Sequence, residues 1–403
     1  MTTPQRSLAA LLTLGLGLGM AACAHPPEST GTDLSGELTP DAVRAVANRV
    51  ADWQLAQYDL KTNNFREEER ASELPQGWVN ATLNIGLMHW AEASGQPEYR
   101  TAVKHLSEVN QWQLGPRVYD ADDHAMGQVY IDLYRQYGKE HMIENTRDVL
   151  TEVVEHPSEV DLAFINDERN RFEADGRVFN DQKCRERWCW ADAIFMAPPV
   201  FFDLSRLTGD PRYAEFADQE FWETTRYLFN EDEQLYLRDS RYFERHDEAG
   251  RLIYWGRGNG WVLAGIARIL AQMPEDFAHR ENYERLYRSM AARLVELQHP
   301  DGNWRSSLLA DHEAPAPESS GTGLLVFALA WGLNQGLIEG EPYEDSVALG
   351  WQALVNAVQP SGMLGWVQQV GFAPGSATED DTQLYGVGAL LLAASELYSK
   401  TER

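Results

Sequence analysis

Residues 254–270, YWGRGNGWVLAGIARIL, contain the pattern on which the fold of this chain depends. A short start rich in Gly, Arg, Asn and Trp leads into a stretch that is apolar on nearly every side and contains small residues. Such a stretch is typical of a helix buried all round, with Gly and Ala where neighbouring helices approach closely. The same pattern occurs six times, with starts at 74–78, 121–124, 188–192, 256–261, 318–322 and 379–383.

A second kind of helix, polar and amphipathic, alternates with these apolar segments. Proline beside acidic residues introduces it at most of its starts, which lie at 39–41, 97–100, 211–214, 281–284 and 342–345, with a further segment at 140–155. One apolar and one amphipathic helix form a hairpin, and no block of strands is large enough for a sheet. Six hairpins predict an all-α fold, closed into an (α/α)6 barrel. An open solenoid is the alternative, but it would need atypical capping repeats at its ends.

The composition narrows the possible partners. The 403 residues carry a formal net charge of −28, which argues against nucleic acid because phosphate backbones are bound through clusters of Lys and Arg. A few arginines in a pocket can still bind a carboxylate despite an acidic surface. The sequence predicts no oligomeric state.

The N-terminus predicts export. Arg6 precedes an apolar stretch that is too short and too rich in Gly for a membrane span, and the sequence Met20-Ala-Ala-Cys23 follows it. This resembles a bacterial lipoprotein signal at residues 1–23 with Cys23 as the lipidated residue, although Met20 leaves ordinary signal-peptidase cleavage as an alternative. Residues 24–38 then form a flexible tether and 39–403 the folded domain. The expected location is the periplasmic face of the outer membrane, with the lipid anchor as the only membrane contact.

The other two cysteines, Cys184 and Cys189, lie five residues apart and could close a small disulfide loop in an oxidising compartment. Their spacing does not fit a metal site, and the chain contains no HExxH motif or paired Cys/His cluster. We therefore expect neither a metal nor a cofactor.

Asp192 is the main candidate for acid/base chemistry. Trp188 and Met196 lie four residues to either side, so on a helix all three would share one face. Burial beside an indole favours a neutral carboxyl, whereas a helix N-terminus favours the anion, and the balance tunes proton exchange. The alternative is that Asp192 only caps the helix.

Two further helix starts supply candidates. In the stretch 119–130, YDADDHAMGQVY, we expect Asp122 to cap and Asp123 to face the site, although a slip of one residue reverses this, and His124 adjoins them. Arg257 and Trp261 lie four apart, so a guanidinium and an indole would project from one helical turn. The alternative is that this Gly-rich stretch only avoids backbone clashes.

Residues 234–258 alternate in polarity around a DEAG turn, which predicts a β-hairpin beside the mouth of the barrel. Its polar side chains, including Arg238, Asp239 and Arg241, could reach a ligand there. The predicted ligand-binding set contains His124, Trp188, Trp190, Arg238, Asp239, Arg241, Arg257, Trp261, Trp78 and Ser320.

Several motifs together resemble one known family. They are WCWADAIFMAPPVF at 188–201, residues 254–270, PDGNWRSSLL at 300–309, APESSGTG at 316–323, GWVQ at 365–368 and TEDDTQLYGVGALLLAASELY at 378–398. In this order they are similar to family 105 of the glycoside hydrolases, the unsaturated rhamnogalacturonyl and glucuronyl hydrolases related to family 88. Ser319 departs from the expected Thr, and Gln369 from a frequent Pro.

The resemblance implies an (α/α)6 barrel that removes a 4,5-unsaturated uronic acid from the non-reducing end of lyase-generated oligosaccharides, such as those of rhamnogalacturonan or ulvan. It implies Asp192 as general acid/base, Asp123 as a second acidic residue, and Arg257 with Trp261 as a substrate-binding pair. The alternatives are a conventional glycosidase or a polysaccharide lyase on the same toroid, or a non-catalytic oligosaccharide-binding lipoprotein.

Overall fold

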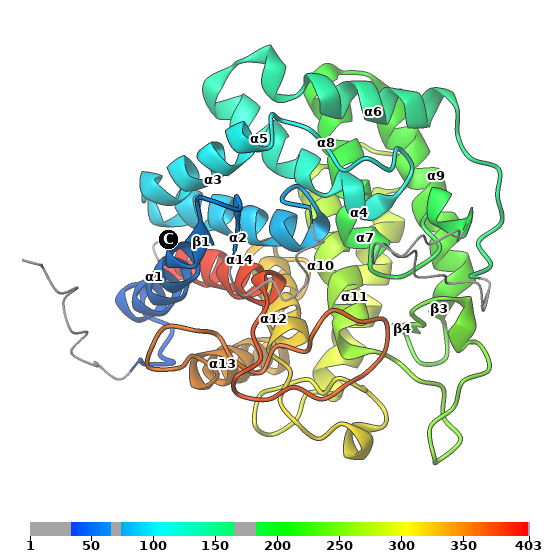
Figure 1. Cartoon of the computed structure of the whole chain (residues 1–403). Coiled ribbons are helices and arrows are strands. Elements are labelled where there is room, and N and C mark those ends of the chain that lie inside the picture. The colour runs from blue at the N-terminus through cyan, green and yellow to red at the C-terminus, as the bar shows by residue number, and fades with distance from the viewer. Residues whose placement is uncertain (1–33, 66–73, 165–182, 402–403) are drawn as a thin grey trace, which may run out of the picture. The chain divides into compact units, whose positions relative to one another are not determined.

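The computed structural model describes residues 34–65, 74–164 and 183–401. The predicted signal segment, Cys23 and most of the predicted tether lie outside these residues. Six apolar helices form an inner ring in the described part: α2 (Trp78–Ser94), α5 (Met126–Tyr137), α8 (Pro198–Thr208), α10 (Gly256–Gln272), α12 (Ser319–Asn334) and α14 (Leu384–Thr401). Each helix packs against the next, and α14 packs against α2 (Figure 1). The ring is therefore closed.

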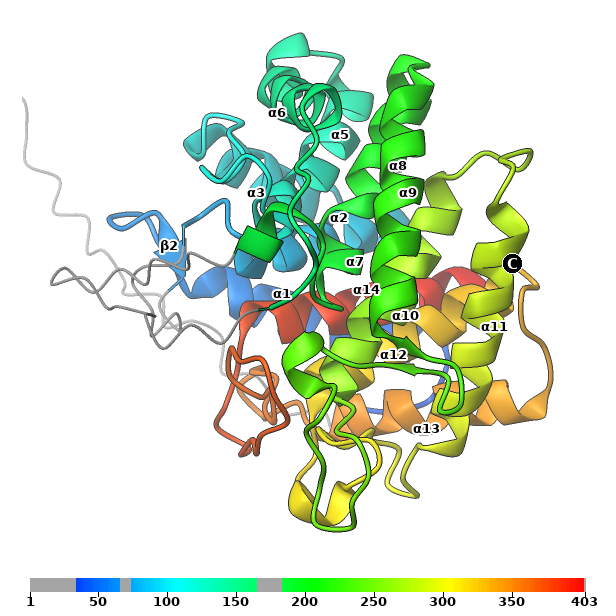
Figure 2. The ribbon, with the colours of Figure 1, turned by 90° about the vertical axis from the view of Figure 1, so that its right-hand side faces the viewer.

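The amphipathic helices lie outside this ring (Figure 2). They are α1 (Pro40–Ala56), α3 (Pro97–Val109), α6 (Glu144–Glu155), α9 (Pro211–Leu228), α11 (Arg280–Glu296) and α13 (Glu341–Asn356). Local chemistry fixes their starts: the Thr39 side chain accepts a hydrogen bond from the backbone of α1, Asp210 does the same for α9, and Pro occupies the first turn of both. The predicted (α/α)6 barrel is confirmed, because α14 packs on α2 instead of leaving two free ends as in a solenoid.

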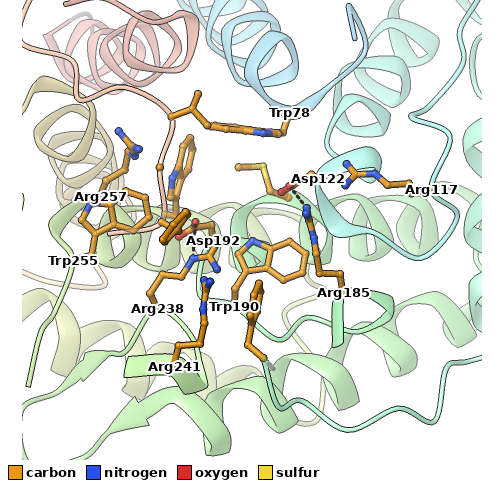
Figure 3. Close-up of a pocket in the computed structure, with 16 residues that line it drawn as sticks. Trp78, Arg117, Asp122, Arg185, Trp190, Asp192, Arg238, Arg241, Trp255 and Arg257 are labelled. Carbon is orange, nitrogen blue, oxygen red and sulfur yellow. Dashed lines mark hydrogen bonds and ion pairs between the residues drawn. The ribbon is translucent and has the colours of Figure 1, made fainter. Parts of the chain in front are cut away.

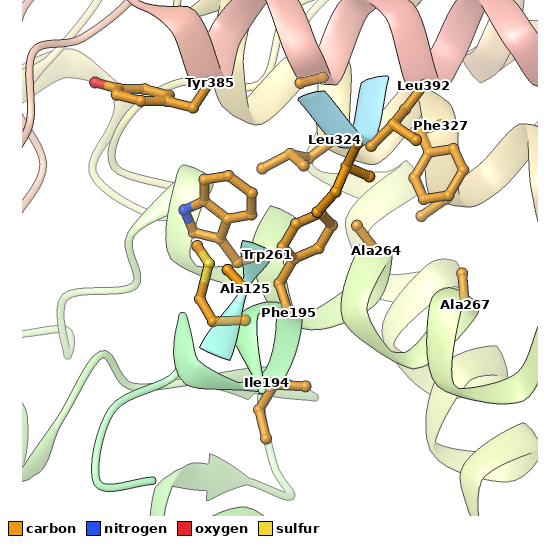
Figure 4. Packing of buried hydrophobic residues seen from close by; sticks show 14 of the residues in the cluster. Ala125, Ile194, Phe195, Trp261, Ala264, Ala267, Leu324, Phe327, Tyr385 and Leu392 are labelled. Carbon is orange, nitrogen blue, oxygen red and sulfur yellow. The ribbon is translucent and has the colours of Figure 1, made fainter. Parts of the chain in front are cut away.

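Small residues allow the inner helices to approach closely. In α12 every residue from 319 to 332 is buried. Where α2 meets α14, a Cβ added at Gly86 would lie 2.5 Å from the Gly388 oxygen, and one at Gly388 would lie 2.3 Å from the Thr82 oxygen. Larger residues fill the space nearer the mouth, where the rings of Phe195 and Trp261 lie 4.8 Å apart between centroids (Figure 4). Backbone contact between α2 and α14 therefore closes the circle of inner helices, and aromatic side chains fill its interior near the mouth.

Two inner helices are interrupted near their starts. The short helix α4 (Ala121–His124) precedes α5, and α7 (Ala193–Met196) precedes α8 with a break at Ala197. Pro198 and Pro199 cause the second break because proline has no N–H to continue a helix. The first turn of each of these two inner helices is thus a separate short helix at the mouth of the barrel.

Strands play a minor part. Two antiparallel hairpins pair β1 (Tyr58–Asp59) with β2 (Asn64–Phe65) and β3 (Phe229–Asn230) with β4 (Leu235–Tyr236). Within the hairpin predicted for 234–258, His246 and Leu252 form only an isolated bridge. The β3–β4 hairpin lies before this bridge, and its second strand falls inside the predicted range. Four 3-10 helices complete the described elements: η1 (Glu140–Met142), η2 (Lys183–Glu186), η3 (Ser240–Tyr242) and η4 (Asp311–Glu313). No helix in the described segments combines the length and apolar character that crossing a membrane requires.

Replacing Gly388 by Ala tests the closure of the ring. The new methyl group would overlap the backbone of α2, which cannot move as a flexible side chain can. We expect a loss of about 1–3 kcal/mol or more in the free energy of unfolding, measured by denaturant titration. Gly371→Ala is the matched control, because its Cβ would find no atom nearer than 3.6 Å. Equal stability of the two variants would contradict this account of the α2–α14 contact.

Candidate active site

A cavity of about 390 Å³ opens where the starts of the inner helices converge (Figure 3). Its walls come from four inner-helix starts, the loop before α7, the segment after β4 and the loop before α14. The lining residues are Trp78, Arg117, Asp122, Phe164, Arg185, Trp190, Asp192, Met196, Arg238, Arg241, Trp255, Arg257, Trp261, Val370, Gly371 and Phe372. Most of the predicted site residues therefore meet in one pocket, although they lie far apart in the sequence.

Asp192 lies at the N-terminus of α7, yet its side chain accepts no hydrogen bond from that helix, so the capping alternative is not supported. The residue is 8% exposed, its Oδ1 is buried without a hydrogen-bond partner among the described residues, and its Oδ2 lies 3.7 Å from Arg238 Nε. Burial raises the pKa of this carboxyl above its ordinary value, and the charges of Arg238 and Arg257 oppose the rise. Asp192 is thus a carboxyl disposed to hold a proton.

The surroundings of Asp192 differ from the prediction in one indole. Because α7 begins at Ala193, Trp188 precedes the helix and does not share a face with Asp192; it packs instead against Phe201 and Phe216 outside the pocket. Met196 does line the cavity. A Cβ at Gly258 would lie 3.2 Å from Trp255 and 3.5 Å from Asp192 Oδ1, so this glycine keeps the space between the Trp255 ring and the carboxyl open.

The second acidic position also differs. Asp120 caps α4, so Asp122 lines the cavity, whereas the carboxylate of Asp123 turns away and accepts hydrogen bonds from Arg117 N and Nε at 2.7 and 2.9 Å. The expected order of Asp122 and Asp123 was wrong, because the cap lies earlier in the chain. Burial and the charge of Asp120 raise the pKa of Asp122 to about 7, opposed by Arg185 and Arg117.

His124 does not reach the cavity. Its Nε2 lies 2.7 Å from the Val118 oxygen, and its ring packs against Phe201. Burial lowers the pKa of the imidazole below its ordinary value. His124 is therefore a structural residue, in contrast to its predicted role in ligand binding.

Arg238, Asp239 and Arg241 form one unit. Asp239 is fully buried and accepts hydrogen bonds from Arg238 Nη1 at 2.7 Å and from Arg241 Nε and Nη2 at 2.9 and 2.7 Å. Although its burial opposes ionisation, these two arginines hold its pKa below the usual value. Arg238 and Arg241 line the cavity and Asp239 does not, so Asp239 positions the arginines and does not itself contact a ligand.

Arg257 and Trp261 both line the cavity, as predicted, but the guanidinium of Arg257 is already engaged. It donates to the backbone oxygens of Gln368 and Gln369 at 2.6 and 3.0 Å, and it lies between the rings of Trp255 and Tyr385. Arg257 therefore fixes the loop before α14.

Of the remaining predicted ligand-binding residues, two line the cavity and one does not. Trp78 and Trp190 line the cavity, and Trp78 meets Trp261 edge-on with 6.2 Å between ring centroids. Ser320 is buried and bonded to Glu318, away from the cavity.

Sequence reasoning missed Arg117, Arg185, Trp255 and the loop residues 370–372. One signal pointed to Arg185: it follows Cys184, which forms a disulfide with Cys189 across a Cα–Cα distance of 5.5 Å. The guanidinium of Arg185 lies 5.1 Å from the centroid of the Trp190 ring. Within the described residues, no group of three or more His, Cys, Asp and Glu side chains is arranged to hold a metal ion.

Comparison with known proteins identifies the family. The family model described as Glycosyl Hydrolase Family 88 matches residues 46–401. The chain belongs to this family. The unsaturated 3S-rhamnoglycuronyl hydrolase of Alteromonas sp. (strain LOR) is 36% identical over 403 residues, covering 96% of each chain.

Two solved structures are similar to this member of family 88. A family 88 glycosyl hydrolase from Bacteroides vulgatus has a TM-score of 0.76 at 26% identity, covering 89% of this chain and 99% of that chain. A protein named as a polysaccharide lyase has a TM-score of 0.75 at 26% identity, covering 90% and 98%. The predicted family is confirmed, and this family 88 protein is a glycoside hydrolase.

Asp239→Asn tests the role of the buried carboxylate. Loss of the charge leaves Arg238 and Arg241 without their common charged acceptor, so they are no longer held in place in the cavity wall. We therefore expect the KM for the oligosaccharide substrate to rise about tenfold or more while the protein stays folded. The measurement is steady-state kinetics beside a thermal melt. Asp247→Asn is the control. Asp247 forms a similar ion pair, with 2.8 Å between its Oδ2 and Arg251 Nε, and this pair is not part of the cavity wall. An unchanged KM in Asp239→Asn would contradict the positioning role.

The raised pKa of Asp122 predicts a pH-dependent stability. Between about pH 4 and pH 7 the folded protein keeps a proton that the unfolded chain has released, so stability falls as the pH rises through this window. Asn does not titrate, so the Tm of Asp122→Asn relative to wild type should be higher at about pH 8 than at about pH 5. Asp301→Asn is the control: Asp301 is partly buried, but Arg305 holds its pKa below the usual value, so this carboxyl is ionised throughout and its effect on Tm should not change between about pH 5 and pH 8. A Tm difference for Asp122→Asn that does not vary with pH would contradict the assignment.

Proposed function

We propose that this hydrolase removes a 4,5-unsaturated uronic acid from the non-reducing end of oligosaccharides that polysaccharide lyases release. Its substrate class would be the unsaturated 3S-rhamnoglycuronyl oligosaccharides in the name of its Alteromonas relative. One observation carries the proposal: a buried carboxyl with a raised pKa, Asp192, lies beside Arg238 in a pocket walled by Trp78, Trp190 and Trp261. A proton donor, a cation and apolar ring faces are what an unsaturated uronate requires.

The chemistry starts from the vinyl ether between C4 and C5 of the substrate. Protonation of C4 places positive charge on C5, where the ring oxygen stabilises it. Water then adds at C5 and loses a proton, and the resulting hemiketal opens and expels the remaining sugar. The net change is the addition of one water molecule, and a single carboxyl can give the first proton and take the second.

Asp192 supplies the proton to C4. Burial favours its protonated form, and the nearby arginines limit this effect so that the carboxyl can also release the proton. Asp122 takes the part that the sequence motif had given to Asp123: it holds the water or stabilises the cationic transition state from the other side of the pocket.

Arg238 binds the C6 carboxylate. Its Nε lies 3.7 Å from Asp192 Oδ2, and Asp239 fixes the other end of the guanidinium. A carboxylate held there keeps C4 and C5 next to Asp192. The indoles of Trp78, Trp190 and Trp261 would cover the apolar faces of the sugar ring.

Ultraviolet absorbance, measured together with the release of the terminal sugar, separates three alternatives. A conventional glycosidase would act without the C4=C5 bond. A lyase, the activity named for one structural neighbour, would create ultraviolet absorbance as it forms a double bond, whereas hydration removes it. A protein that only binds oligosaccharides would leave the absorbance unchanged.

Asp192→Asn is the decisive variant. We expect wild type to remove the absorbance of lyase-digested rhamnogalacturonan or ulvan, and the variant to lose about 10²–10⁴-fold in kcat while still binding the substrate. Asp210→Asn makes the same chemical change at the cap of α9, outside the pocket, and should keep near-wild-type activity. Near-wild-type turnover by Asp192→Asn would reject the assignment of the acid.

A further inference from the structure

The short helix that follows the acid lacks part of its own hydrogen bonding. Asp192 immediately precedes α7, a helix of four residues. In a continuous helix the oxygens of Ile194 and Phe195 would accept hydrogen bonds from the N–H groups four residues further on. Pro198 and Pro199 occupy these positions and have no N–H. A helix this short is marginal by itself, so contacts with other elements must determine where Asp192 lies.

A side-chain amide from another inner helix supplies donors to this segment. Gln128 of α5 is buried, and its Nε2 donates to the Phe195 oxygen at 3.0 Å and to the Met196 oxygen at 3.1 Å. The amide nitrogen thus makes two hydrogen bonds to the backbone of α7. A buried carbonyl oxygen that loses its donor is costly, so these bonds hold the end of α7 in one place.

Arg268 of α10 determines which end of the amide faces α7. A side-chain amide can turn by about 180° and present its oxygen in place of its nitrogen. Arg268 is buried, and its Nε donates to Gln128 Oε1 at 2.8 Å. Because a guanidinium has donors and no acceptor, it pairs only with the oxygen of the amide, and the nitrogen is therefore directed to α7.

Two further contacts hold Arg268 itself. Its Nη1 lies 2.6 Å from His89 Nε2. Burial and the charge of Arg268 lower the pKa of His89 to about 3, so the imidazole is neutral and its Nε2 accepts the hydrogen bond. The guanidinium also lies 5.8 Å from the centroid of the Phe195 ring, which belongs to α7. None of His89, Gln128, Phe195 and Arg268 lines the cavity, so these contacts act from behind the site.

We propose that Gln128 is a positioning residue for Asp192, and that Arg268 and His89 orient its amide. Gln128 acts through the backbone of α7 and does not contact the substrate. A displacement of about 1 Å at a reacting group can lower a rate about 10²-fold, so the place of α7 decides whether the carboxyl reaches C4. The inference rests on the proposed function, because it concerns the proton that Asp192 gives to C4.

Gln128→Glu tests the proposal with almost no change of shape. The variant keeps an acceptor for Arg268 but places an oxygen against the Phe195 and Met196 oxygens, so α7 loses both hydrogen bonds and is repelled. We expect kcat to fall about tenfold or more while KM stays within about threefold of the wild-type value, measured by loss of ultraviolet absorbance. Gln128→Met removes the donors without adding a charge and should change kcat and KM in the same directions.

Gln298→Glu is the matched control for the loss of two hydrogen bonds to backbone oxygens. Nε2 of Gln298 donates to the Gly302 and Ser346 oxygens, both at 2.9 Å, and none of these three residues lines the cavity. This variant should lower the Tm and keep the wild-type kcat. If Gln128→Glu lowers the Tm in the same way but leaves kcat unchanged, Gln128 has a structural role only and the proposal is rejected.

Variants of Arg268 test the orientation of the amide. Arg268→Met removes the donor that holds Gln128 Oε1, so the amide can turn and kcat should fall about fivefold or more. Arg268→Lys keeps a charged donor and should retain more of the wild-type kcat than Arg268→Met does. A wild-type kcat in Arg268→Met would show that the amide needs no such partner and would reject the orienting role.

A wild type that turns over no unsaturated oligosaccharide would count against the proposed function, and the positioning role is then tested without catalysis. Because burial raises the pKa of Asp192, the Tm of Asp192→Asn relative to its parent should increase from about pH 4 to about pH 8. In the Gln128→Met background, water reaches the displaced carboxyl, so this increase should fall to about half or less. The charged neighbours Arg238, Arg257 and Asp239 are the same in both backgrounds. An increase of equal size in both would overturn the proposal.

Discussion

Two prolines impose the constraint on which the geometry of the pocket depends. Pro198 and Pro199 cannot donate the hydrogen bonds that would continue the third inner helix through Ala197, so backbone oxygens of α7 lose their helical partners. The buried amide of Gln128 replaces the partner of Phe195 by donating to its oxygen at 3.0 Å, and it also donates to the Met196 oxygen at 3.1 Å. Arg268 in turn donates to Gln128 Oε1 at 2.8 Å.

This arrangement makes α7 a separate short segment held from inside the barrel. Buried carbonyl groups without partners are costly, so the Gln128 amide both satisfies them and fixes where the segment lies. Gly265 of α10 adds a steric limit, because a Cβ there would lie 2.6 Å from the Ile194 oxygen. Asp192 begins this segment, and Met196 ends it in the cavity wall. The position of the acid is thus set by contacts on the side away from the substrate.

The sequence predicted the ring better than the pocket, for a physical reason. The hydrophobic period and the proline starts are local signals, and they placed the inner and outer helices correctly. Asp192, Arg238 and Arg257 also reached the cavity as expected. Which of Asp122 and Asp123 faces the cavity depends on which aspartate caps α4, and whether Trp188 shares a face with Asp192 depends on where the helix begins. A shift of one residue in a helix start changes both answers, and tertiary contacts determine that start. The suggested disulfide loop contained Arg185, but the contact of its guanidinium with Trp190 in the cavity wall depends on the tertiary structure.

The comparison of Arg257 with Arg238 explains why residue type alone did not assign roles. Both side chains line the cavity, and both leave Nε without a hydrogen-bond partner among the described residues. Arg257 is buried and both of its Nη atoms donate to backbone oxygens, so it shapes the loop that contains Phe372. Arg238, with 12% of its side chain exposed, donates from Nη1 to Asp239, and its Nε lies 3.7 Å from Asp192 Oδ2. An arginine in a pocket binds a ligand only with the donors that the protein has not used. The chemistry of this pocket therefore follows from counting hydrogen bonds, residue by residue, and only then from counting charges.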